Sequence, residues 1–217
     1  GDPTLYQRLV AAHLDDIGWL TGLPYAFVAT PDQANFYVVF ERNDRLIEAT
    51  ADYMPTLSQH AGAISKTLCF GIYSVNGASE IKRAIIGIPT DRAASAGKLS
   101  ACIVEEMTQV LGLPNDSDDL APSIFNDRSI DDALTALDRM LVRSLYDPTL
   151  YPGMSRDDAL VQVRALAHDP LIAQRPPQTN PGRDTATASR SGSGQGSPNN
   201  AIDSGLVYQF RYEPGGT

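Results

Sequence analysis

A strand pattern that leads directly into an amphipathic helix constrains the fold most strongly. Residues 81–88 are rich in isoleucine, and a helical repeat follows from Ala96 to Leu111. In that repeat the apolar positions recur every three or four residues, which is typical of a helix with one buried face. These positions are Ile103, Met107, Val110 and Leu111. Gly112 follows them as the predicted C-terminal cap, so the segment predicts a helix of defined length packed against a sheet.

Helical repeats and strand-like runs also divide the rest of the chain. Further helical repeats cover 3–22, 131–146 and 156–167. Runs of aromatic and β-branched residues predict strands at 25–28, 35–42 and 68–73. The Asn76-Gly77 pair lies between the runs 68–73 and 81–88, and it predicts a hairpin. Ser155 precedes the last helical repeat as a predicted N-cap, and residues 45–60 read as a connecting helix or loop. Together these elements predict an α+β fold.

The composition changes abruptly beyond Pro170, and this change predicts the domain organisation. Residues 1–170 contain the periodic segments and form the predicted globular domain. Residues 171–205 are rich in Pro, Gly and Ser and have little to bury, so they predict a flexible segment. Residues 206–217 begin with an alternating run that predicts a terminal strand docked back on the domain.

Charge excludes some classes of protein. The chain has 217 residues with 17 basic and 26 acidic side chains, a net charge of −9. An acidic chain without a basic stripe is a poor match for a nucleic-acid backbone, so no nucleic-acid partner is expected. Residues 105–132 hold eight carboxylates and one arginine. Such a segment either attracts cations or is simply a solvated acidic loop.

The end of the predicted helix at 96–111 carries the residues best suited to bind a metal ion or to catalyse a reaction. Metzincin proteases use the pattern H-E-x-x-H-x-x-G-x-x-H, in which three histidines bind zinc and the glutamate activates water. This chain keeps the spacing, the central glutamate and the glycine, but it has no histidine at any of the three ligand positions. The corresponding residues are Glu105, Glu106, Gln109, Gly112 and Asn115, with Asp116 immediately after them.

A second motif supports the same comparison. Ser123, Ile124 and Phe125 stand where metzincins place a Ser-Ile-Met turn beneath the metal, with Phe instead of Met. The sequence from Glu105 to Asp116, together with Ser-Ile-Phe-Asn-Asp, resembles that of an uncharacterised bacterial family, domain of unknown function 2927. Members of this family are often predicted lipoproteins. The resemblance implies a zincin-like (metzincin-like) α+β domain with a small mixed sheet, a motif helix beneath it and a helical C-terminal part. It also implies a periplasmic, cell-envelope or secreted protein, with membrane contact only through a lipid anchor.

The donor types at the altered positions decide which metals are expected. Carboxylate and amide oxygens suit Ca²⁺, Mg²⁺ or Mn²⁺ rather than Zn²⁺, which in catalytic sites normally needs imidazoles. His13, His60 and His168 do not stand at ligand spacing with one another. We therefore expect either no cofactor or one of these hard divalent ions. Alternatively, Glu105 and Gln109 have a structural role as hydrogen-bonding partners one helical turn apart.

Two functions follow from this site. The first is a non-proteolytic binding or scaffolding module that holds a peptide or protein segment in the former active-site cleft, along an edge strand at 81–88. The alternative is a hydrolase or peptidase that uses a non-zinc divalent ion with Glu106 as general base. A structural envelope protein with a filled cleft is a third possibility.

The chain has two cysteines, Cys69 and Cys102. The even count, together with the oxidising compartment that the resemblance implies, predicts a disulfide between Cys69 and Cys102. Two buried free thiols are the alternative.

Overall fold

A five-stranded mixed sheet forms the centre of the molecule in the computed structural model, which describes residues 2–168 and 206–212. The strand order is β1-β5-β2-β4-β3. Their bounds are β1 Tyr25–Phe27, β2 Phe36–Glu41, β3 Phe70–Val75, β4 Ile81–Pro89 and β5 Leu206–Tyr212. β2 and β4 are parallel, with Val38 opposite Ile86, and the remaining neighbours are antiparallel. Residues 206–212 thus pair between β1 and β2, whereas the predicted flexible segment 171–205 lies outside the described residues.

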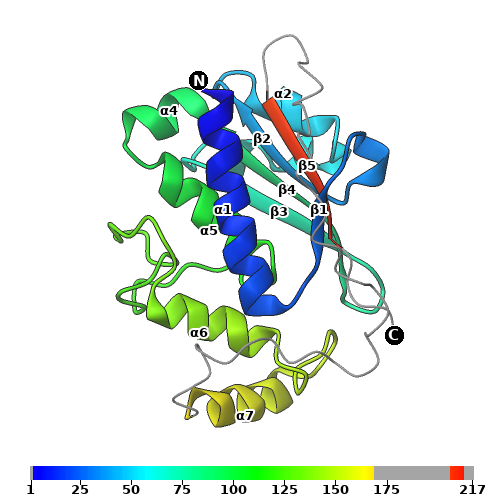
Figure 1. The fold of residues 1–217 in the computed structure, drawn as a ribbon, viewed down its shortest axis with the longest axis vertical. Helices are drawn as coiled ribbons and strands as arrows, with labels where there is room; N and C mark the ends of the chain where they lie inside the picture. Colours follow the sequence, from blue (N-terminus) through cyan, green and yellow to red (C-terminus); the bar gives the residue numbers. More distant parts are fainter. Residues whose placement is uncertain (1, 169–205, 213–217) are drawn as a thin grey trace.

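The helices are α1 Pro3–Thr21, α2 Leu46–Ala51, α3 Ala61–Ile64, α4 Thr90–Ser95, α5 Leu99–Gln109, α6 Ala136–Leu145 and α7 Arg156–Ala167. Short 3₁₀ helices cover Pro31–Gln33 and Pro55–His60. In Figure 1, α1 and α5 lie in front of the sheet, α2 lies behind it, and α6 and α7 stack at one end. No helix in the described part of the chain is long and apolar enough to cross a membrane.

β2 explains why both faces of the sheet are covered. All six of its residues are buried, and successive side chains of a strand point to opposite faces. Phe36, Val38 and Phe40 belong to the core shared with α1 and α5. Tyr37 and Val39 belong to a second core shared with α2 and the segment that follows it. The sheet is therefore the middle of three layers.

One prediction about the sheet is wrong. β4, which contains residues 81–88, is not an edge strand, because it pairs with β2 on one side and β3 on the other. The hairpin predicted around Asn76-Gly77 is confirmed as β3 and β4, so the edge next to the motif helix is β3. The β2–β4 pair is parallel and distant in sequence, and no local pattern at 81–88 reveals such a partner.

The predicted helix bounds need three corrections. The segment 96–111 is preceded by α4, and Gly97, with a φ of 66°, separates α4 from α5. α5 ends at Gln109 with Val110 as its C-cap, so Gly112, with a φ of 120°, ends the turn that follows the helix and does not cap the helix itself. The helix predicted from 131 begins only at Ala136, because Thr135 caps it in a capping box with Asp138. Ser155 caps α7 as predicted.

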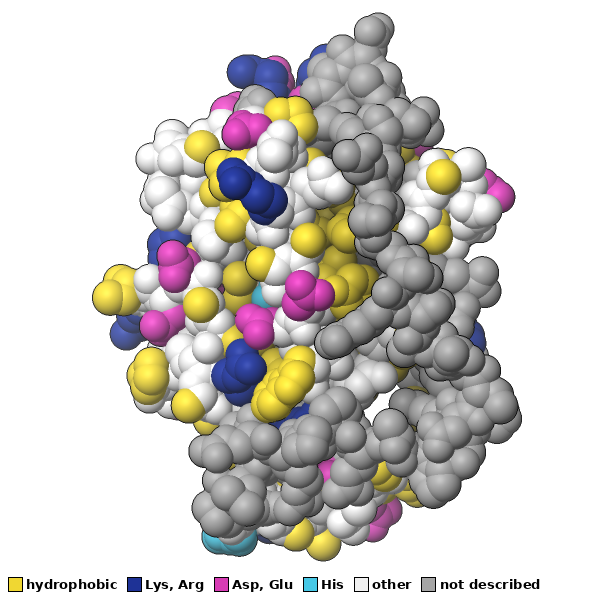
Figure 2. Space-filling view, viewed as in Figure 1, with side chains coloured by type: hydrophobic (Ala, Val, Ile, Leu, Met, Phe, Trp, Pro, Cys, Tyr) yellow, Lys and Arg dark blue, Asp and Glu magenta, His cyan; other side chains and the backbone are white. Residues whose placement is uncertain are grey.

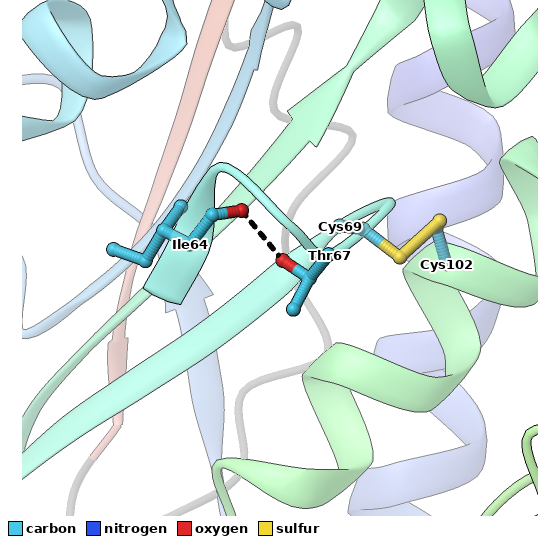
Figure 3. The surroundings of a disulfide bond; sticks show 4 residues. All are labelled: Ile64, Thr67, Cys69 and Cys102. Atoms are coloured by element: carbon cyan, nitrogen blue, oxygen red, sulfur yellow. Dashed lines mark hydrogen bonds between the residues drawn. A yellow bond between two sulfur atoms is a disulfide. The ribbon is translucent and has the colours of Figure 1, made fainter. Parts of the chain in front are cut away.

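The Cys69–Cys102 disulfide is present and joins the residue before β3 to α5 (Figure 3). The two Cα atoms are 5.9 Å apart, within the usual range for this bond. Beside it, the Thr67 hydroxyl donates a hydrogen bond to the Ile64 carbonyl at 2.9 Å. A bridge that closes a loop of 33 residues stabilises a protein by about 3–4 kcal/mol on the chain-entropy argument. The bridge therefore fastens the edge strand to the motif helix.

A buried histidine joins α1 to α5. His13 is 4% exposed, and its Nε2 lies 3.0 Å from the Thr108 hydroxyl oxygen. That hydroxyl donates its hydrogen to the Val104 carbonyl at 2.6 Å, so its oxygen accepts from His13 Nε2–H. Burial lowers the pKa of His13 from 6.5 to about 4, and the nearby Arg139 adds to this, while Asp16 and the Val104 carbonyl oppose it.

We predict that His13→Gln removes part of the protein's acid sensitivity. Between pH 6.5 and about 4, His13 is protonated in the unfolded chain but stays neutral in the folded protein. Its contribution to stability is therefore lost as the pH falls through this range. Between about pH 7.5 and about pH 4.5, the unfolding free energy of the wild type should fall by about 2 kcal/mol more than that of the variant. Chemical denaturation at both pH values measures this. His60→Gln, at an exposed position, is the control; equal pH dependence in both variants and the wild type contradicts the prediction.

Candidate functional site

The candidate site lies where α5 meets β3 and the loop between α5 and α6. α5 holds Glu105, Glu106 and Gln109, because its apolar stripe faces the sheet and α1 and turns these polar residues toward the strand edge and the loop. Glu106 is 6% exposed and Gln109 is 9% exposed, whereas Glu105 is half-buried. On the face that α1 covers, acidic, basic and apolar side chains are interspersed among the described residues (Figure 2).

Glu106 lies against the edge strand. Its carboxyl group accepts a hydrogen bond from the backbone N–H of Gly71 in β3. A Cβ atom at position 71 would lie 2.7 Å from Val110 Cγ1 and 3.0 Å from Glu106 Oε2, so only glycine permits this approach of strand and helix. Burial raises the pKa of Glu106 to about 8, and the charges of Glu105 and Asp116 raise it further, while the Gly71 hydrogen bond opposes them. Glu106 is therefore mainly protonated at neutral pH.

Three carboxylates converge beside it. One oxygen each from Glu105, Asp116 and Asp127 lies within 4.8 Å of the other two. Burial raises the pKa of Glu105 to about 7, with Asp116 and Asp127 adding to the shift and Lys98 opposing it. Burial and Asp127 also raise the pKa of Asp116. Near neutral pH this acidic cluster is therefore stabilised either by protons that it retains or by a cation that binds to it.

Gln109 and Asn115 have different surroundings. The Gln109 side-chain amide donates a hydrogen bond to Asp116 Oδ1 at 2.5 Å, so Gln109 orients the acidic cluster from its side. Asn115 is exposed, and its neighbour Asp116 is the residue that enters the cluster. Of the predicted metal positions, the structure brings Glu105 and Asp116 together and places Gln109 in contact with Asp116.

Asp127 was missed by sequence reasoning. It is exposed, and it follows Glu105 by more than twenty residues across an irregular loop, so helical spacing cannot connect them. The only sequence signal was the excess of carboxylates between 105 and 132, which does not distinguish Asp127 from Asp118 or Asp119.

The predicted turn beneath the site is buried. Ser123, Ile124 and Phe125 are at most 4% exposed, and the two apolar side chains pack with Val104 of α5. The Ser123 hydroxyl donates to Asp138 of α6 at 2.5 Å. The turn thus connects the motif helix to α6 while the loop on either side of it reaches the acidic cluster.

The donor set fits a hard cation better than zinc. The cluster offers carboxylate oxygens alone, which suit Ca²⁺, Mg²⁺ or Mn²⁺. His13 bonds to Thr108 on the α1 side of α5, and its Nε2 is occupied there. Glu105, Asp116 and Asp127 would therefore hold such an ion, with Glu106 beside them.

The fold and the site together define an α+β domain with a mixed sheet and an acidic site between a helix and the loop that follows it. The chain belongs to the family described as a protein of unknown function (DUF2927), which matches residues 2–165. The match includes the whole acidic cluster, and it confirms the family resemblance of the sequence. No curated protein and no solved structure matches the chain.

We predict that Glu106→Gln stabilises the protein in alkaline solution. Folded Glu106 keeps its proton up to about pH 8, whereas in the unfolded chain it releases the proton near pH 4.5, so the protein loses stability progressively between about pH 4.5 and about pH 8 and stays at the lower value above that. Glutamine keeps an acceptor for Gly71 N–H without the buried charge. Its unfolding free energy should exceed that of the wild type by about 2–4 kcal/mol at about pH 9, and match it more closely at about pH 4.

Chemical denaturation across this pH range measures the difference. Glu48→Gln, at an exposed position on α2, is the matched control and should leave the pH profile unchanged. A Glu106→Gln profile parallel to that of the wild type would show that Glu106 ionises freely in the folded protein.

Proposed function

We propose that this protein is an extracytoplasmic, non-proteolytic binding module built on a zincin-like plan. The observation that carries this proposal is the state of Glu106, which takes the place of the water-activating glutamate of a metzincin. It is 6% exposed and its carboxyl group accepts the Gly71 N–H, so it is placed as a buried hydrogen-bonding group rather than as a base open to water. The ligand positions around it hold no imidazole. The Cys69–Cys102 disulfide supports an oxidising compartment.

The edge of β3 is the surface that we propose for binding. Within the described residues β3 pairs with β4 alone, and Gly71, Ile72 and Tyr73 are partly exposed. The Gly71 N–H bonds to Glu106, which lies on α5 and not on β4, so this N–H points away from the sheet. Because strand residues alternate, the Tyr73 N–H points the same way. An extended polypeptide segment can pair with such an edge through its own backbone.

Peptide binding and peptide survival test this proposal together. Peptides selected from a random display library on the disulfide-bonded protein should bind the wild type and be recovered intact by mass spectrometry. Tyr73→Pro removes the outward N–H without removing a ladder bond, and it should weaken binding by about tenfold or more. Tyr73→Ala keeps the N–H and is the matched control. Peptide cleavage that Glu106→Ala abolishes would refute the non-proteolytic function.

A second candidate function is a hydrolase that depends on a hard divalent ion, and the acidic cluster favours it. Glu105, Asp116 and Asp127 would hold the ion, and its charge would lower the pKa of the neighbouring Glu106 so that this carboxylate could take a proton from water. In this reading Gln109 holds Asp116 in place.

Thermal unfolding with added ions tests the second candidate. Ca²⁺ or Mn²⁺ at millimolar concentration should raise the melting temperature of the wild type by a few degrees, about what 1 kcal/mol of binding gives. Asp127→Asn should abolish the increase, whereas Asp119→Asn, in the same loop but outside the cluster, should retain it. If no divalent ion stabilises the wild type, the ion-dependent hydrolase is rejected.

A further inference from the structure

Asp138 is a buried carboxyl group whose contacts extend beyond the capping box of α6. It lies in the first turn of α6 and is 0% exposed. Its Oδ1 accepts the Ser123 hydroxyl at 2.5 Å. Its Oδ2 accepts the backbone N–H groups of Ile124 at 3.1 Å and of Thr135 at 2.8 Å. One side chain therefore joins the start of α6 to the turn beneath the candidate site.

The bonds continue from this turn to the acidic residues. The Ser123 oxygen accepts the Phe125 N–H at 3.1 Å, and the Phe125 carbonyl accepts the N–H of Ser117 at 2.8 Å. Ser117 directly follows Asp116, and Asp127 comes two residues after Phe125. The Asn126 amide adds a second connection, because it donates to the Asp118 and Leu120 carbonyls. Both arms of the loop are thus tied to the turn that Asp138 holds.

Packing gives the turn its position relative to α5. Ile124 and Phe125 form a small core with Val104, the residue directly before Glu105. Asp116 and Asp127 are themselves exposed, so packing of their own side chains does not hold them opposite Glu105, and the hydrogen bond from Gln109 reaches Asp116 and not Asp127. Their mutual repulsion would drive a free loop away from the helix.

We propose that Asp138 is a positioning residue of the candidate site. Through Ser123 and the turn at Phe125, Asp138 holds Asp116 and Asp127 against Glu105. α6 contributes no group to the acidic cluster, yet through this carboxylate it determines the geometry of the cluster. The inference rests on the proposed site, and it specifies how the site is organised before any ligand binds.

A double-mutant cycle tests this role without a ligand, so failure of peptide or ion binding leaves the result interpretable. Near pH 8, Glu105→Gln relieves repulsion from Asp116 and Asp127 and should raise the melting temperature of the wild type by about 3 °C. In the Asp138→Asn background, where the loop is released, the same substitution should give less than half of that increase. A residue that only stabilised α6 would instead give an additive result.

Two further variants keep the test decisive. Ser123→Ala removes the links from Ser123 to Asp138 and to the Phe125 N–H but leaves the bond between Asp138 and Ile124, so it should reduce the Glu105→Gln increase by a smaller amount, even if Asp138→Asn does not fold. Ser155→Ala removes the serine N-cap of α7, away from the site, and should leave the full increase. An undiminished Glu105→Gln increase in the Asp138→Asn or Ser123→Ala background would overturn the proposal.

Discussion

The close contact between β3 and α5 is the constraint on which the rest of the site depends. Gly71 has no side chain, so the strand approaches the helix until Glu106 and Val110 lie directly against its backbone. The Cys69–Cys102 disulfide fastens the same two elements on the residues just before this contact. As a result Glu106 loses its water and bonds to the Gly71 N–H. A larger residue at position 71 would separate the strand from the helix and expose the carboxyl group.

Electrostatic crowding is the second organising feature, and it follows from the first. Glu106 is buried by the strand, and Glu105 faces two aspartates from the loop, so burial and repulsion raise the pKa of each carboxyl group on α5. Such an arrangement persists only when other parts of the fold hold it together. Here the turn at Ile124 and its bond to Asp138 supply that support, together with packing on Val104.

Much of the architecture followed from the local pattern. The hairpin around Asn76-Gly77, the left-handed glycine that closes the turn after the motif helix at Gly112 and the cap at Ser155 were predictable, because turn and cap chemistry depends on a few adjacent residues. α4 was not predicted, and the helix predicted from Ala96 begins only at Leu99, after the break at Gly97. The position of β4 inside the sheet was also missed, because its parallel partner β2 is about forty residues away.

The sequence by itself determined which residues stand in the frame of the motif and which chemistry they lack: glutamate, glutamine and asparagine where imidazole would be needed, and two cysteines able to pair. Only the tertiary structure decided which carboxyl groups meet. Asp127 joins Glu105, Asn115 stays in solvent and Gln109 bonds to Asp116. The physical reason is that helical spacing specifies neighbours one turn apart, whereas the path of the loop depends on the burial of Phe125 and on hydrogen bonds to another helix.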